Sequence, residues 1–233
     1  MNITIRKSEE RGHANHGWLN SKHTFSFADY YDPDHMGYRS LRVINDDRVA
    51  AKQGFGTHPH SNMEIFSYVI SGQLQHEDSM GNGRVIQAGE FQYMSAGAGV
   101  YHSEFNPGEE EAHFLQIWIQ PNQTGGEPKY AELDTKALSS QDGLTLFASS
   151  DGRDRSVQMR QEAEIYFGKA PAGQTLTVPA SPLEGVWLHL ISGALTIDGH
   201  TIHPGDSLSI DDAQDGFTLS VDQDAEFILF RLQ

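Results

Sequence analysis

The chain has 233 residues, a formal net charge of −16 and no cysteine. Without cysteine, disulfides, thiolate chemistry and cysteine-ligated zinc or iron–sulfur clusters are excluded, so any metal site must draw on His, Asp and Glu. The acidic balance, with no Lys or Arg between Arg84 and Lys129, argues against a protein that binds nucleic acid directly by neutralising phosphates.

The sequence also argues against membrane contact. The segment MNITIRKSEERGH lacks the apolar centre of a secretory signal, and no run reaches the roughly 18 to 20 apolar residues that cross a bilayer as a helix. No amphipathic segment rich in Lys and Arg is present to adhere to an anionic membrane. We therefore expect a cytoplasmic protein.

Short apolar or alternating runs follow one another between clusters of Gly, Pro, Asn and Asp, which predicts an all-β sandwich or barrel. In chain order they are SLRVI, MEIFSYVI, GRVIQ, FQYMSA, HFLQIWIQ, LTLFA, VWLHLI, ALTID, SLSI and FILFRL. The polar stretch EPKYAELDTKAL separates HFLQIWIQ from LTLFA and is either one short helix or a linker.

Two segments of the first half of the chain recur in the second half. YVISGQL at 68–74 is matched by HLISGAL at 189–195, and IQAGEFQYM at 86–94 by IHPGDSLSI at 202–210. The nearly constant offset indicates a duplicated β-unit. We predict an N-terminal metal-binding domain over residues 1–133 and a C-terminal domain over 134–233, joined in PNQTGGEP or the residues after it, where Pro and Gly cluster.

Two pairs of candidate metal ligands share one spacing. His58 and His60 flank Pro59 at i and i+2, so in extended backbone both imidazoles project from the same face. Pro59 cannot donate to a sheet ladder, which predicts the start of a strand or an irregular edge. His102 and Glu104 repeat the spacing after a Gly-rich turn. On neighbouring strands these pairs would offer three imidazoles and one carboxylate, which suit iron, copper, nickel, zinc or manganese and leave coordination positions open.

These motifs resemble the two sequence motifs of the cupins. The first motif is matched by Gly54, His58, His60, Glu64 and Gly72, and the second by Gly89, Glu90, Gly97, His102 and Asn106. The block RGHANHGWLNSKHTFSFADYYDPDHMGYRSLRVINDD, with QHEDSMGN and MSAGAGVYHSE, resembles the pirin family, a bicupin branch, and is similar to bacterial pirin-like quercetin dioxygenases. The resemblance is densest over residues 5–120 and implies two tandem cupin barrels of the double-stranded β-helix type.

The resemblance also implies a ligand set. In pirins the metal is held by the His-x-His pair, the His of the second motif and a Glu two residues later, which implies His58, His60, His102 and Glu104 here. The implied cofactor is one divalent transition metal, with iron as the leading candidate and copper, nickel, zinc, manganese or cobalt as alternatives. Glu64, a ligand in other cupins, would lie near the site without binding the metal.

The second domain departs from this pattern. By the repeat offset, Pro179 and Ser181 stand where His58 and His60 stand in the first copy, and the counterpart of His102 falls near Thr218. We therefore expect the C-terminal domain to lack metal ligands.

The resemblance implies a function as well, that of a flavonol 2,3-dioxygenase which cleaves quercetin with O2 and releases carbon monoxide. In this scheme the metal binds the deprotonated 3-hydroxyl of the flavonol, and either Glu104 or Glu64 accepts its proton. The alternative is a non-enzymatic metal-binding regulator that docks on a transcription factor or a metabolic enzyme. A third hypothesis is a cupin that binds a small ligand without chemistry.

Two further features have more than one interpretation. His23 opens the run HTFSF and either lines a pocket with Phe25 and Phe27 or belongs to an ordinary aromatic core strand. Gly97-Ala98-Gly99 has the first spacing of a dinucleotide-binding loop, but it lacks a third glycine and a following helix pattern, which favours a turn.

Overall fold

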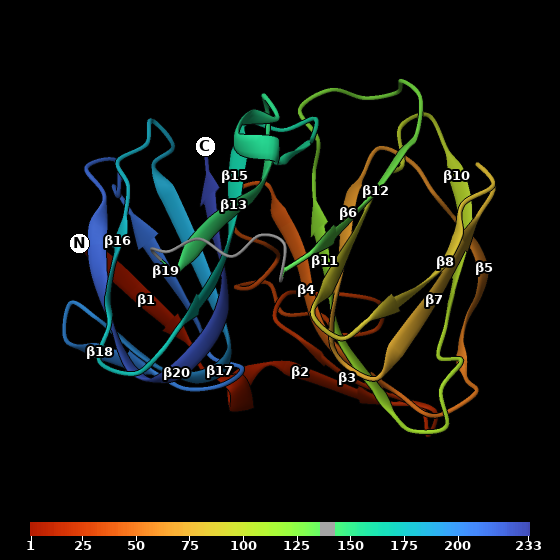
Figure 1. The fold of residues 1–233 in the computed structure, drawn as a ribbon, viewed down its shortest axis with the longest axis horizontal. Coiled ribbons are helices and arrows are strands. Elements are labelled where there is room, and N and C mark those ends of the chain that lie inside the picture. Colours follow the sequence, from red (N-terminus) through yellow and green to blue (C-terminus); the bar gives the residue numbers. More distant parts are fainter. Residues whose placement is uncertain (136–142) are drawn as a thin grey trace. The chain divides into compact units, whose positions relative to one another are not determined.

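The computed structural model describes residues 1–135 and 143–233, and in these ranges the chain is built almost entirely of strands (Figure 1). Its helices there are two short 3₁₀ helices, Ser8–Glu10 and Arg153–Arg155. No helix in the described ranges is long and apolar enough to cross a membrane. The prediction of an all-β chain is confirmed.

Contacts divide the chain into two units, Gly12–Ala137 and Met1–Arg11 with Leu138–Gln233. The first unit contains a seven-stranded sheet of order β12-β9-β6-β11-β4-β3-β2 and a four-stranded sheet of order β5-β10-β7-β8. Its strands are β2 Gly12–Asn15, β3 Leu19–His23, β4 Leu41–Val49, β5 Gly54–His60, β6 Glu64–Ser71, β7 Gln73–Asp78, β8 Gly83–Gln87, β9 Glu90–Ser95, β10 Val100–Phe105, β11 Ala112–Ile119 and β12 Lys129–Asp134.

The core of this unit packs side chains of both sheets against one another. Val69 and Phe114 of the seven-stranded sheet meet Leu74 and Ile86 of the four-stranded sheet in one buried cluster. Each such side chain contributes roughly 1.5–3 kcal/mol by leaving water. Since successive residues of a strand point to opposite faces, Val69 fixes the face of β6 that looks into the barrel, which is the face of Ile65 and Ser67.

The second unit is a nine-stranded sheet with the path β1-β19-β17-β20-β15-β13-β14, to which β16 adds on β20 and β18 on β17. A large apolar cluster fills it, in which Val186, Leu188 and Leu190 of β17 lie beside Phe227 and Leu229 of the neighbouring strand β20. Its strands are β1 Asn2–Arg6, β13 Leu144–Ser149, β14 Val157–Gln158, β15 Ala163–Ala170, β16 Thr175–Val178, β17 Gly185–Ile197, β18 His200–Ile202, β19 Ser207–Asp211 and β20 Phe217–Leu232.

The first strand belongs to this C-terminal unit, which differs from the predicted division into residues 1–133 and 134–233. β1 pairs antiparallel with β19 from Asn2 opposite Asp211 to Arg6 opposite Ser207, so the red strand lies among the blue ones in Figure 1. The Asp206 carboxylate fixes the end of β1, because it accepts hydrogen bonds from the Lys7 ammonium at 3.0 Å and the Ser8 amide at 2.8 Å. The two strands are some 200 residues apart in the sequence, so no local sequence pattern predicts their pairing.

The polar stretch EPKYAELDTKAL does not begin as a helix. Its residues 129–134 form β12, which pairs antiparallel with β9, and residues 136–138 lie outside the described residues. The predicted boundary between residues 133 and 134 therefore falls inside a strand of the N-terminal unit.

The two repeat segments share backbone geometry. Gly72, between β6 and β7, has φ +75°, and its counterpart Gly193, at a register shift of β17, has φ +84°. Gly89 and its counterpart Gly205 have φ +86° and +82°. These left-handed conformations favour glycine, so the matched glycines mark equivalent turns in both units.

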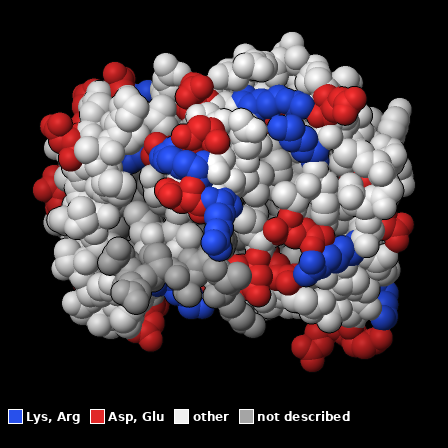
Figure 2. Space-filling model, turned by 45° about the horizontal axis from the view of Figure 1, so that its top comes forward, with Lys and Arg blue, Asp and Glu red and all other residues white. Residues whose placement is uncertain are grey.

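Basic side chains lie among acidic ones on the face that Figure 2 shows. Among the described residues, Arg84 forms ion pairs with Glu90 and Glu132, and Arg153 forms ion pairs with Asp151 and Glu164. Acidic and basic side chains are thus mixed on this face.

The turn at Gly193 yields a stability prediction. A Cβ at Gly193 would lie 2.2 Å from the Asp224 carbonyl oxygen, whereas a Cβ at Gly173, which has the same φ of +84°, meets nothing within 4 Å. Gly193→Ala should lower the free energy of unfolding by about 1–3 kcal/mol more than the control Gly173→Ala, because only the first adds overpacking to the backbone strain. Urea unfolding curves measure the difference, and equal losses would contradict this account of the turn.

Candidate metal centre

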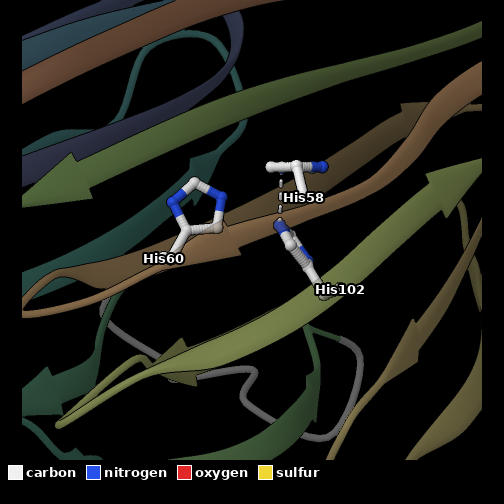
Figure 3. A group of neighbouring side chains, drawn as sticks. All are labelled: His58, His60 and His102. Carbon is white, nitrogen blue, oxygen red and sulfur yellow. Dashed lines mark hydrogen bonds between the residues drawn. The ribbon is translucent and has the colours of Figure 1, made fainter.

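Pairing of β5 with β10 brings the predicted histidines together. His58 and His102 are directly opposite in the antiparallel register, and His60 lies opposite Val100. β5 is an edge strand of its sheet, as expected from Pro59, because an edge position leaves one side of the strand without ladder bonds. Figure 3 shows the three imidazoles turned toward one another, two from β5 and one from β10.

The three rings form a compact group of nitrogen donors. Ring centroids are 4.5 Å apart for His58 and His102 and 4.8 Å apart for the other two pairs, and one ligand atom of each residue lies within 4.8 Å of the others. The Nε2 atoms of His58 and His102 are 3.0 Å apart. Among the residues that the structure describes, this is the one group of His, Asp or Glu side chains placed to hold a metal ion.

Hydrogen bonds at Nδ1 assign the tautomer of His58. Its Nδ1 lies 2.8 Å from the Gly56 carbonyl oxygen, which can only accept, so Nδ1 carries the hydrogen. With its hydrogen on Nδ1, the ring can present the lone pair of Nε2 to the centre, as a metal ligand requires.

His102 is oriented by a second, buried histidine. His76 Nε2–H donates to Asp78 at 3.0 Å and Gln92 Nε2–H donates to His76 Nδ1 at 2.9 Å, so His76 Nδ1 is an acceptor. His102 Nδ1 lies 3.4 Å from that same acceptor and on this assignment carries the hydrogen. His102 then turns the Nε2 lone pair toward His58, and His76 and Asp78 act as its outer partners.

Two of the three histidines, His60 and His102, are held in the neutral form by their surroundings. Burial, followed by the neighbouring His102 and His58, lowers the pKa of His60 to about 4. Burial, followed by the neighbouring His58 and His76, lowers the pKa of His102 to about 3. Since imidazole binds metal in its neutral form, these donors need lose no proton to take up a divalent ion. Three converging imidazoles fit iron, nickel, copper or zinc.

Glu104 stands beside the histidine group, after a register shift in β10 that separates it from His102. Its Oε2 accepts a hydrogen bond from Gln116 Nε2 at 2.7 Å. Ser67 Oγ lies 2.9 Å from Glu104 Oε1 and 2.8 Å from Gln116 Oε1, and its single hydrogen can go to either. Glu104 is buried and lines the same cavity as His58, but it is not among the three residues grouped within 4.8 Å.

Glu64 is not brought to the site, and the expectation that it lies near the metal needs correction. Its carboxylate accepts hydrogen bonds from Tyr93 Oη and from Ser95 Oγ, the latter at 2.6 Å. Glu64 is three residues before Ser67, so alternation along β6 sends its side chain to the face opposite the barrel interior. The spacing of the cupin motif does not show on which face of β6 the Glu64 side chain lies.

A cavity of about 640 Å³ adjoins the histidines within the N-terminal unit, a typical volume for a small-molecule site. Aromatic side chains form much of its wall: Trp18, Phe27, Tyr30, Phe55 and Trp118. Of the aromatic segment HTFSF, His23 and Phe27 line the cavity, while Phe25 is buried elsewhere. The pocket interpretation therefore holds for His23 and Phe27.

The cavity wall also contains polar residues that the sequence analysis did not predict as site residues: Ser21, Asn45 and Asp47. His23, which the sequence analysis considered as a pocket residue, lies among them. Burial raises the pKa of Asp47 to about 7, although Ser21 donates a hydrogen bond to its carboxyl, and the carboxylates of Glu104 and Asp46 add to the rise. The sequence holds one signal for two of these residues. Asn45 and Asp47 alternate with Val43 and Val49 and so occupy core-facing positions of β4.

Two β-barrel units with one three-histidine centre at the wall of a cavity define a bicupin metal protein. The family model described as Pirin matches residues 4–119, and the model of the quercetinase C-terminal cupin domain matches residues 146–232. The chain is 46% identical to a quercetin 2,3-dioxygenase of Escherichia coli K12 over 231 residues, which are 99% of this chain and 98% of the relative. The chain belongs to the pirin family, and its two cupin barrels are confirmed.

Solved structures agree with this assignment. YhhW from Escherichia coli superposes with a TM-score of 0.94 at 45% identity, covering 100% of this chain and 98% of that one. A structure described as the bacterial pirin YhhW in complex with nickel(II) gives a TM-score of 0.93 at 45% identity and covers 99% of both chains. Together with the histidine group, the nickel complex of this relative supports a divalent metal here.

The partner of His102 yields a prediction about metal affinity. His76→Ala removes the acceptor that orients His102 Nδ1–H, and loss of such an outer partner weakens metal binding by roughly 10–100-fold. Calorimetric titration of the metal-free protein with nickel(II) measures the effect. His113→Ala is the control, since His113 pairs with Asp46 at 2.7 Å on another face of the sheet and should leave the affinity unchanged. Equal affinities of the two variants would refute the role of His76.

Proposed function

We propose that this protein is a metal-dependent quercetin 2,3-dioxygenase, which opens the flavonol ring with O2 and releases carbon monoxide. The observation that carries the proposal is the position of three imidazole donors beside an aromatic-walled cavity of about 640 Å³. The name of the Escherichia coli relative, a quercetin 2,3-dioxygenase, supports the same substrate and reaction.

The proposed ligands are His58, His60 and His102 through their ring nitrogens, with Glu104 as the fourth. Iron is the proposed metal, and nickel, copper, zinc, manganese and cobalt are the alternatives. Which metal occupies such a donor set depends on metal availability as much as on affinity. A bound divalent ion supplies a Lewis acid that lowers the pKa of a phenolic hydroxyl and leaves positions for substrate.

Glu104 is the proposed acceptor of the proton from the flavonol 3-hydroxyl. Its carboxyl is buried and lines the cavity, and contacts with Gln116 and Ser67 hold it in place. The carboxylate oxygens are therefore fixed beside the histidines. Glu64 is not proposed for this role, since it lies on the opposite face of β6. Geometry comes before pKa in choosing a general base, and of these two carboxylates Glu104 is the one that lines the cavity beside His58.

The aromatic wall suits a flat, three-ring substrate. Trp18 meets Phe55 edge-on at 5.2 Å between ring centroids, and Phe27 meets Trp118 in the same manner at 5.4 Å. Trp118 also lies edge-on to His60 at 5.0 Å, so the wall continues to the metal ligands. Such walls bury aromatic area, exclude water and hold the substrate beside the donors.

The C-terminal cupin is proposed to act without a metal. Pro179 and Ser181 occupy the positions that correspond to His58 and His60, and the residues described there contain no group placed like the three histidines.

Oxygen uptake tests the proposal. With quercetin, protein of known metal content should consume oxygen in proportion to bound metal and release carbon monoxide, and the double variant His58→Ala/His102→Ala should fall to the background of metal-free protein. A double variant of exposed histidines of the C-terminal unit, His200→Ala/His203→Ala, should keep full activity. Bound metal without oxygen uptake on any flavonol would refute the dioxygenase assignment.

A further inference from the structure

A row of buried polar side chains crosses the inner face of the seven-stranded sheet away from the histidines. Ser67 on β6 lies opposite Gln116 on β11, Gln116 lies opposite Asn45 on β4, and Asn45 lies opposite His23 on β3. Gln116 bonds Glu104, so the row begins at the metal centre. It ends two strands beyond Gln116, which is about 10 Å at ordinary strand spacing.

The far end of this row is a cluster of four residues, Ser21, His23, Asn45 and Asp47, here called the β3–β4 polar cluster. Ser21 is directly opposite Asp47, and His23 is directly opposite Asn45. All four are at most 4% exposed, and all four line the cavity. An ordinary barrel interior holds apolar side chains at such positions, because burial of a polar group costs free energy unless it gains a partner.

The cluster satisfies only part of its own hydrogen-bonding capacity. Ser21 Oγ–H donates to Asp47 Oδ1, and His23 Nδ1–H donates to Asn45 Oδ1 at 2.9 Å. The other polar atoms of the two β4 side chains, Asp47 Oδ2 and Asn45 Nδ2, form no hydrogen bond with any residue in the described part of the chain. One acceptor and one donor thus remain side by side on β4, at positions 45 and 47 of the same inner face.

We propose that the β3–β4 polar cluster is a hydroxyl-recognition subsite, in which Asp47 Oδ2 accepts from and Asn45 Nδ2 donates to neighbouring phenolic hydroxyls of a polyphenol. The inference rests on the proposed function, since it places the other end of the same molecule at His58, His60 and His102. The aromatic wall between the two ends covers the rings, and the cluster selects flavonols with a catechol on the outer ring.

A binding measurement tests the subsite apart from turnover. Nickel-loaded protein is titrated without oxygen with quercetin, whose outer ring carries two neighbouring hydroxyls, and with galangin, whose outer ring carries none. Wild type should bind quercetin about tenfold or more tightly, the effect of one or two hydrogen bonds. In Asp47→Leu and in Asn45→Leu this preference should fall toward one, while the affinity for galangin stays unchanged.

Asp46→Asn is the matched control, because Asp46 precedes Asp47 but points to the other face of β4, where it pairs with His113. It should retain the wild-type preference. Where a leucine variant fails to fold by circular dichroism, Asp47→Asn replaces it, since this side chain keeps the acceptor for Ser21 and exchanges only the outer oxygen for a donor. The preference should fall there too.

The outcomes separate the two proposals. A wild type without preference, or a preference that survives in folded Asp47 and Asn45 variants, overturns the subsite even when quercetin is oxidised. A preference that the variants abolish supports the subsite, and if no oxygen is consumed with quercetin, the dioxygenase assignment alone fails.

Discussion

The antiparallel register between β5 and β10 is the constraint on which the site depends. It sets His58 opposite His102, and extended backbone at Pro59 keeps His60 on the same face as His58. A slip of one residue would turn the whole set of side chains to the other face of the sheet. The shared core of Val69, Phe114, Leu74 and Ile86 holds the two sheets that carry the centre and the cavity.

Burial then decides the chemistry of the centre. Removal from water, with neighbouring imidazoles, lowers the pKa of His60 and His102 and leaves both rings as neutral donors. The hydrogen bonds of His76 with Asp78 and Gln92 determine which nitrogen of His102 faces the centre. The interior is thus polar in two places, at the histidines and at the β3–β4 polar cluster, with aromatic rings between them. This distribution suits a ligand that is flat and apolar in the middle and hydroxylated at both ends.

Local patterns predicted the strand runs and the convergence of the three histidines, because alternation and the His-x-His spacing act over a few residues. They could not predict what depends on pairing partners. Glu64 matches a cupin motif in spacing, yet its face is set by the position of β6 in the sheet. β1 joins β19 through contacts far along the chain. Alternation along β4 gives Asp47 a core-facing position, but its place in the cavity wall depends on the pairing of β4 with β3.

The central claim is that one divalent ion binds between His58, His60 and His102, and anomalous diffraction from crystals of nickel-loaded protein tests it most directly. The account predicts one strong peak at about 2.1 Å from a ring nitrogen of each of the three histidines. A peak bounded by other side chains, with these three rings uncoordinated at full metal content, would contradict it.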